Sequence, residues 1–138
     1  MKRIESVDPE NSEGLVDEVK DFWSRNINAE KLMGRSVTEH PRGSDGYFAD
    51  LEQQRYRSHR HLLPWIKAMQ PGRSVLEIGC GVGMGSFQMA KHGLDVTGID
   101  LTDVAVAEVR KRFEDNGLAA RFEVGDAGAL AFADESFD

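Results

Sequence analysis

A glycine-rich stretch, VLEIGCGVGMGS at residues 75–86, constrains the fold of this chain more than any other feature. An apolar run leads into it, and glycines then occupy alternate positions: Gly79, Gly81, Gly83 and Gly85. Glycine adopts positive φ angles at little cost and lets another molecule lie directly against the main chain. Parallel sheets bind ligands at turns of this kind, where a strand leads into a helix. The stretch therefore predicts a ligand-binding turn at the carboxyl end of a strand.

The residues from position 73 onward alternate between strand and helix patterns. We expect strands over 74–78, 95–99 and 120–124, separated by helices over 84–91 and 103–115. Gly93 follows the first helix at a C-terminal cap position, and Thr102 precedes the second as its N-cap. Strand–helix–strand–helix–strand is the order of a parallel sheet with right-handed crossovers. The fold class is therefore α/β, with one mononucleotide-binding half of a doubly wound sheet.

Residues 1–72 have a different character and are expected to form an N-terminal helical cap. One amphipathic helix is indicated by apolar residues at helical spacing, namely Leu15, Val16, Val19, Phe22 and Trp23. A loop over 34–46 follows, and a second helical stretch over 47–69 is broken or kinked by Pro64. We expect residues 10–70 to pack against the ligand or the sheet edge. The residues expected nearest the ligand are Phe22, Trp23, Tyr47 or Arg55.

Composition and charge narrow the class of protein. The net charge of −7 and the pI of about 5.1 disfavour a nucleic-acid or anionic-membrane surface. No apolar run approaches the roughly 18 residues of a membrane span. The first residues lack the apolar core of a signal peptide, and the single cysteine, Cys80, excludes an internal disulfide. We therefore expect a cytoplasmic protein. His59 and His61 lie two residues apart, on different helix faces, so no metal site is expected there.

Acidic residues follow the second and third predicted strands. Asp100 ends the second strand, where a carboxylate can accept hydrogen bonds from both hydroxyls of a ribose. Asp126 follows the third strand, where its carboxylate can accept from an exocyclic amine such as that of adenine. The backbone N–H of Ala127 is placed to reach a ring nitrogen. Three sites at three successive strand ends predict a ligand that contains a nucleoside.

The register of the glycines favours one class of nucleoside ligand over another. The dinucleotide fingerprint G-x-G-x-x-G, started at Gly79, requires a small residue at position 84, where Met84 stands. Started at Gly81, it ends on Ser86, which is a weaker match. Glu77 precedes the first glycine and suits a ligand with a cationic amino group better than a pyrophosphate. An enzyme that uses NAD is therefore the less favoured reading.

Three motifs together resemble those of class I S-adenosylmethionine-dependent methyltransferases. Residues 77–83 are similar to the E/D-x-G-x-G-x-G motif, residues 96–100 to the second motif and residues 124–127 to the third. The resemblance covers about residues 73–138 and implies S-adenosylmethionine as the cofactor, with S-adenosylhomocysteine as its product. The implied cofactor-binding residues are Glu77, Gly79, Cys80, Gly81, Gly83, Asp100, Leu101, Asp126 and Ala127. No metal site is expected.

The resemblance implies transfer of a methyl group to a small-molecule acceptor. The attack by an acceptor O, N or C would be in line with the sulfonium methyl. A module that binds the cofactor or a nucleoside without turnover is the alternative. The sheet of the family has seven strands, ordered 3-2-1-4-5-7-6, and the predicted pattern supplies only the first three. Because the predicted pattern lacks the acceptor-side elements, we assign no catalytic residue, and we expect a fragment, a truncated product or a minimal domain.

The same strand order predicts how two copies of the chain could associate. With the strands ordered 3-2-1, residues 74–78 form an edge, and their sequence has no lysine or proline to blunt it. Antiparallel pairing of this edge with its copy would give a two-fold dimer with one continuous sheet. Aggregation, exchange of the N-terminal helices and further strands outside the chain are the competing outcomes.

Overall fold

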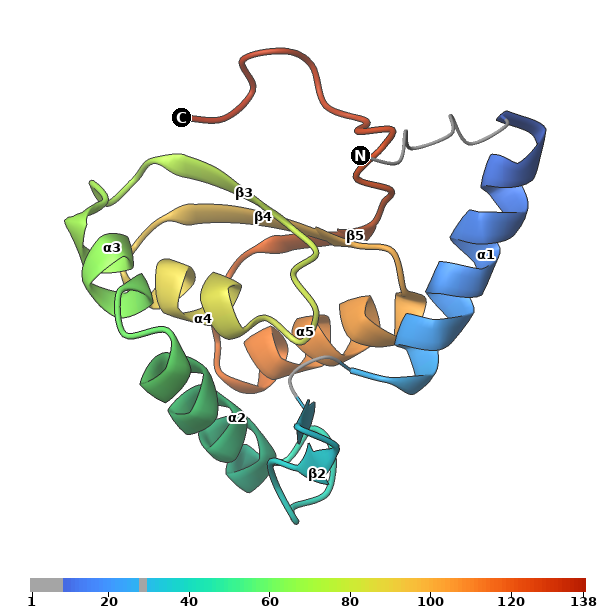
Figure 1. The fold of residues 1–138 in the computed structure, drawn as a ribbon. Helices are drawn as coiled ribbons and strands as arrows, with labels where there is room; N and C mark the ends of the chain where they lie inside the picture. Colours follow the sequence, from blue (N-terminus) through green and yellow to red (C-terminus); the bar gives the residue numbers. More distant parts are fainter. Residues whose placement is uncertain (1–8, 28–29) are drawn as a thin grey trace, which may run out of the picture.

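The computed structural model describes residues 9–27 and 30–138 and has an α/β architecture (Figure 1). A parallel sheet contains β3 (Ser74–Ile78), β4 (Asp95–Asp100) and β5 (Arg121–Val124) in the order β3-β4-β5. Ile78 pairs with Ile99, and Asp100 pairs with Val124, so the carboxyl ends of the strands meet at one edge of the sheet. The predicted fold class, strand order and parallel pairing are confirmed.

Two helices cover one face of this sheet, while the segment after β5 passes over the other (Figure 1). They are α4 (Met84–Lys91) and α5 (Asp103–Asp115). Thr102 caps α5 as predicted, because its hydroxyl accepts a hydrogen bond from the N–H of Ala105 at 3.3 Å. Gly117, with a φ of +62°, follows the end of α5. The local signals in the sequence therefore predicted these helices almost to the residue.

An aromatic cluster joins α4, α5 and β5. The ring of Phe113 meets that of Phe87 at 5.8 Å and that of Phe122 at 4.7 Å, both edge to face. Val109, which is fully buried, packs in the same cluster. Edge-to-face aromatic pairs stabilise a core beyond the area they bury. This cluster holds the two helices under the strand ends that carry the candidate site.

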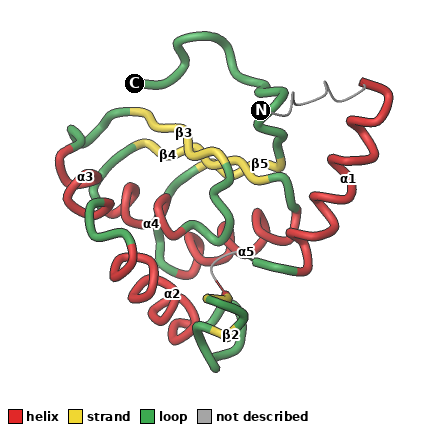
Figure 2. The backbone as a smooth tube through the Cα atoms, viewed as in Figure 1, coloured by secondary structure: helices red, strands yellow, loops and turns green. Residues whose placement is uncertain are grey.

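Within its described residues, the N-terminal part contains three helices and a short hairpin (Figure 2). The helices are α1 (Pro9–Arg25), α2 (Asp45–Ser58) and α3 (Leu62–Ala68). The hairpin pairs β1 (Lys31–Leu32) with β2 (Arg35–Ser36) and was not predicted from the sequence. The first eight residues of the predicted cap lie outside the described residues, and its division from the sheet domain at residue 72 stays a prediction.

The predicted position of the break in the second helical stretch was wrong. α2 ends at Ser58, and α3 begins at Leu62, so the break precedes Pro64 and the proline lies in the first turn of α3. Proline is tolerated there because the N–H groups of a first helical turn have no partner within the helix. The proline therefore helps to start a helix here rather than to end one.

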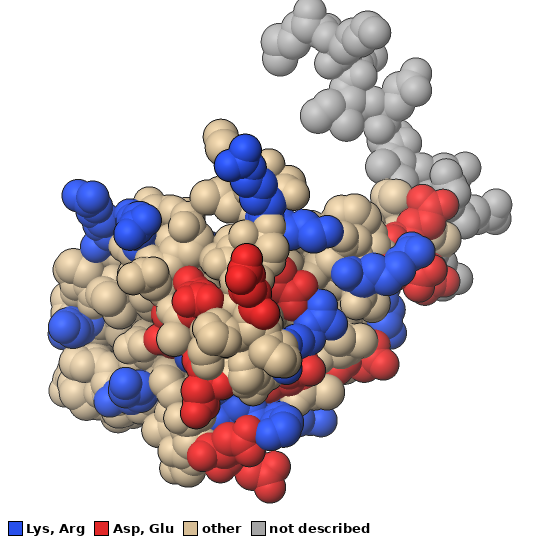
Figure 3. All heavy atoms as spheres, turned by 90° about the horizontal axis from the view of Figure 1, so that it is seen from below, with Lys and Arg blue, Asp and Glu red and all other residues tan. Residues whose placement is uncertain are grey.

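The surface carries charges of both signs. On the face drawn in Figure 3, Asp and Glu gather toward the middle, and Lys and Arg lie mostly around them. This face has no continuous basic patch of the kind that binds a nucleic-acid backbone. Among the helices of the described residues, none is both long enough and apolar enough to span a bilayer.

Candidate functional site

Residues 79–81 form a turn after β3, the glycine turn, which is hydrogen-bonded to the end of the neighbouring strand β4. The N–H groups of Gly79 and Cys80 both donate to the carbonyl of Ile99, at 2.8 and 2.9 Å. Gly79 and Gly81 have φ angles of +71° and +53°, and a Cβ atom added to either would meet no heavy atom within 4 Å. Glycine is therefore required here by the backbone conformation, and it leaves open space above the turn.

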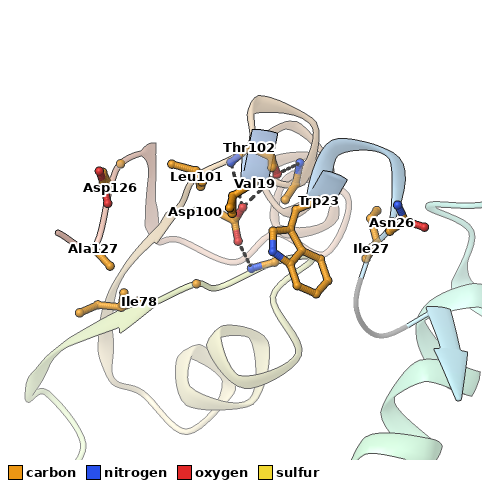
Figure 4. Close-up of a pocket in the computed structure, with 14 residues that line it drawn as sticks. Val19, Trp23, Asn26, Ile27, Ile78, Asp100, Leu101, Thr102, Asp126 and Ala127 are labelled. Carbon is orange, nitrogen blue, oxygen red and sulfur yellow. Dashed lines mark hydrogen bonds between the residues drawn. The ribbon is translucent and has the colours of Figure 1, made fainter. Parts of the chain in front are cut away.

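Asp100 faces this turn from the end of β4. Its Oδ2 accepts a hydrogen bond from the N–H of Gly81 at 2.9 Å. Its Oδ1 accepts from both the N–H and the hydroxyl of Thr102, at 3.0 and 2.9 Å. Three donors thus fix the orientation of the carboxylate beside the glycine turn, as Figure 4 shows.

A cavity of about 340 Å³, the first cavity, opens over the strand ends (Figure 4). Predicted cofactor residues that line it are Gly79, Gly81, Asp100, Leu101, Asp126 and Ala127. The N-terminal part contributes Val19, Trp23, Asn26 and Ile27. Asp126 is exposed, and its Oδ1 accepts from the N–H of Gly128 at 2.8 Å. The structure therefore gathers residues from three strand ends and from α1 around one space.

A second cavity, of about 420 Å³, also borders the glycine turn. It shares Ile27, Gly79 and Gly81 with the first cavity. Its polar wall contains Lys31, Gln54, Arg55, Ser58, His59 and Glu77. Its apolar wall contains Ile27, Leu32, Val37, Leu51, Cys80, Val82 and Met84. The turn at residues 79–81 is thus a shared boundary, so one elongated ligand could lie across it with an end in each cavity.

Glu77 lines the second cavity and accepts hydrogen bonds from the start of α4. Its Oε2 accepts hydrogen bonds from the N–H of Ser86, at 2.8 Å, and from the Ser86 hydroxyl. Burial raises the pKa of Glu77, while the bonds from Ser86 and the charge of Arg55 oppose that rise. A Cβ atom on Gly85 would lie 2.5 Å from Oε1 of Glu77. Gly85 is therefore glycine because the carboxylate needs that space.

Cys80 and Gly83 are both closely surrounded by other side chains of the core. Cys80 is buried, and burial raises the pKa of its thiol to about 12, so the thiolate needed for nucleophilic chemistry does not form at neutral pH. Gly83 lines neither cavity, and a Cβ atom there would lie 2.4 Å from Cγ2 of Val109. Close packing against Val109 on α5 and a φ of +78° therefore both account for the glycine at position 83, and its predicted contact with the cofactor stays a prediction.

Of the four residues expected nearest the ligand, two line a cavity and two do not. Trp23 lines the first cavity, and Arg55 lines the second. Phe22 lines neither and is 52% exposed. Tyr47 also lines neither, because it is buried in the core with its hydroxyl donating to Glu30 at 2.9 Å. Among the described residues, no group of three or more His, Cys, Asp or Glu side chains could hold a metal ion.

Several lining residues were missed from the sequence. Asn26 and Ile27, just beyond the end of α1, belong to no motif, and Thr102 was expected only as a helix cap. Ile27 is 8% exposed and contributes to both cavities. Its position depends on how the N-terminal part packs on the sheet. No local pattern in the sequence carries that information.

Comparisons with known proteins agree with this geometry. Residues 75–138 match the family model described as a methyltransferase domain. The 2-methyl-6-phytyl-1,4-hydroquinone methyltransferase of Synechocystis sp. (strain ATCC 27184 / PCC 6803 / Kazusa) is 31% identical over 121 residues, which cover 86% of this chain and 38% of that enzyme. The chain thus spans less than half of the length of this relative.

Two solved structures extend the comparison. The PH0226 protein from Pyrococcus horikoshii OT3 is 34% identical with a TM-score of 0.54, over 62% of this chain and 41% of that one. The tRNA (uracil-54, C5)-methyltransferase of Pyrococcus abyssi was solved in complex with S-adenosyl-L-homocysteine. It is 25% identical with a TM-score of 0.51, and the match covers 60% of this chain and 20% of that one. Together with the strand order and the glycine turn beside Asp100, these matches show that the chain belongs to the class I methyltransferases, whose cofactor is S-adenosylmethionine.

Proposed function

We propose that this chain binds S-adenosylmethionine across the glycine turn and presents its methyl group to a small-molecule acceptor. The observation that carries the proposal is the position of residues 79–81, which border both cavities. Asp100 lines the first cavity and Glu77 lines the second. An elongated cofactor with a nucleoside at one end and an amino acid at the other matches this division.

The first cavity suits the nucleoside end. Asp100 is already oriented by Gly81 and Thr102, and a carboxylate can accept further hydrogen bonds from ribose hydroxyls. Asp126 and Ala127, after β5, offer a carboxylate and a backbone N–H to the edge of an adenine ring. The indole of Trp23 lines the same cavity and provides an apolar surface for a planar base.

The second cavity suits the methionine end, which carries an ammonium and a carboxylate group. Glu77 at the turn and Arg55 on α2 provide charges of the opposite signs. Charge-assisted hydrogen bonds of this kind are stronger than neutral ones. In this arrangement the sulfonium, which lies between the two ends of the cofactor, falls near Gly79 and Gly81.

The rest of the second cavity suits a small acceptor. The whole second cavity, of about 420 Å³, lies within the usual volume range for small-molecule pockets, and its walls combine apolar and polar side chains. When bound, the cofactor supplies a methyl group activated by the positive sulfur. The residues of the chain then contribute alignment, and alignment alone can lower a barrier by about 7–11 kcal/mol.

A transfer assay tests this proposal. The chain is incubated with S-adenosylmethionine labelled in the methyl group and with panels of small phenols, amines and carboxylic acids, alongside tRNA and an unrelated protein. We expect label in a small molecule and none in either macromolecule. Label in tRNA or protein would contradict the small-molecule acceptor. Binding of S-adenosylhomocysteine without transfer to any acceptor would favour a cofactor-binding module without turnover.

A further inference from the structure

Arg112, on α5, is a buried cation that lies under the glycine turn. Its side chain is only 3% exposed, although arginine is almost never fully buried unless it is paired. It lines neither cavity, so direct contact with the cofactor does not explain it. A buried guanidinium needs hydrogen-bond acceptors for its N–H groups, and the acceptors that Arg112 uses are informative.

The guanidinium joins three parts of the molecule. Its Nη1 donates to the carbonyl of Gly83 at 3.1 Å, and its Nη2 donates to Oε1 of Glu52 on α2 at 2.5 Å. It also stacks between the rings of Phe48 and Phe87, with its Cζ 4.3 and 3.8 Å from their centroids. Planar stacking and forked donation at one site are specific to arginine, and lysine cannot reproduce both.

A short chain of hydrogen bonds leads from Gly83 to Asp100. The N–H of Gly83 donates to the carbonyl of Cys80 at 2.9 Å, which closes a turn around Gly81. The N–H of Gly81 in turn donates to Oδ2 of Asp100 at 2.9 Å. Displacement of Gly83 would therefore shift the turn and the donor that orients the Asp100 carboxylate.

A second set of contacts leads from Arg112 to α2. Glu52 also accepts a hydrogen bond from Nε2 of Gln88 on α4, at 3.2 Å. Tyr56, one helical turn further along α2, donates its hydroxyl hydrogen to the carbonyl of Met84 at 2.6 Å. The carbonyls of residues 83 and 84 thus both accept hydrogen bonds from side chains on other helices, and the carbonyl of Gly83 also accepts one from the N–H of Phe87 at 3.0 Å. Arg112 lies at the junction of these contacts, between the helix that carries Arg55 and the turn that borders both cavities.

We propose that Arg112 is a positioning residue for cofactor binding: its bond to Gly83 holds the glycine turn in the conformation that orients Asp100. This inference rests on the proposed cofactor site, because it concerns the turn on which that site is built. If Arg112 served only the stability of the fold, its loss would lower cofactor affinity no more than any equally destabilising change nearby.

The test compares Arg112→Lys and Arg112→Met with Glu52→Gln. The Glu52 variant weakens the buried ion pair but leaves Arg112 able to donate to Gly83, so it is the matched control. For each protein, urea unfolding gives stability, and calorimetry gives the dissociation constant for S-adenosylhomocysteine. We expect both Arg112 variants to raise that constant about tenfold, the size of one lost hydrogen bond, and Glu52→Gln to change it less than about twofold.

A further readout applies to Arg112→Lys, the more conservative variant, if Arg112→Met does not fold. Amide hydrogen exchange at Gly81 should quicken in this variant relative to Glu52→Gln, because its acceptor on Asp100 is no longer aligned. Equal changes in affinity and exchange in the Arg112 and Glu52 variants, at similar losses of stability, would overturn the inference. Failure of the unaltered chain to bind S-adenosylhomocysteine would instead refute the proposed cofactor site, and the inference with it.

Discussion

At the residue scale, Asp100 has two structural roles that a substitution would disrupt together. It accepts hydrogen bonds from Gly81 and Thr102, and it borders the first cavity. We predict that Asp100→Ala weakens binding of S-adenosylhomocysteine by roughly 1–3 kcal/mol, because ribose hydroxyls and the Gly81 N–H lose their acceptor. Calorimetry measures the change. Asp95→Ala, at the opposite end of β4, is the control, and equal affinities in the two variants would remove Asp100 from the site.

A second prediction at this scale concerns Gly83, the N-cap of α4, whose contact with Val109 on α5 leaves no room for a side chain. Gly83→Ala should lower the free energy of unfolding by roughly 1–3 kcal/mol more than Gly117→Ala. Both glycines have positive φ angles, but a Cβ atom at Gly83 meets Val109 at 2.4 Å, whereas at Gly117 it meets nothing within 4 Å. Urea unfolding measures the difference. Equal losses would mean that backbone strain alone, and not packing on α5, requires glycine at position 83.

At the scale of elements, α1 provides a wall of the first cavity although much of its apolar face is exposed. Trp23 is 39% exposed and lines the cavity, whereas its neighbour Phe22 is 52% exposed and does not. We predict that Trp23→Ala weakens S-adenosylhomocysteine binding by about 0.5–1.5 kcal/mol, the value of an aromatic contact, and that Phe22→Ala has a smaller effect. Calorimetry on both variants checks this, and a larger effect of Phe22→Ala would place the ligand on the other side of α1.

Elements with strong local signals in the sequence were predictable, and elements without such signals were not. β3 and α4 were predicted to the residue, because a short apolar strand, a glycine turn and Gly93 as a cap are all local signals. The hairpin at residues 31–36 has strands of two residues each, too short to produce a pattern. Asp100 and Asp126 were predicted as site residues from their places at strand ends, and both line the first cavity. Arg112 was not, because its partners on α2 and in the turn are brought together only by the tertiary fold.

At the scale of the whole molecule, the edge of the sheet predicts association between copies. β3 is an outer strand of the sheet, and Ile78 at its end is 49% exposed. The C-terminal segment lies at its start, where the N–H of Asp138 donates to the carbonyl of Ser74 at 3.1 Å. We predict a homodimer through antiparallel pairing of residues 75–78, and weaker association of the Ile78→Lys variant. Sedimentation at micromolar concentration tests this, and a well-folded monomer would contradict it.

The central claim is that one cofactor, S-adenosylmethionine, lies across the turn at residues 79–81 with its ends in the two cavities. Its most direct test is a calorimetric titration of the chain with S-adenosylhomocysteine and, separately, with NAD. Binding of S-adenosylhomocysteine at a one-to-one ratio, weakened by Asp100→Ala at one end and by Arg55→Gln at the other, is the predicted result, with no binding of NAD. Preferential binding of NAD, or binding of S-adenosylhomocysteine that neither substitution affects, would contradict the account.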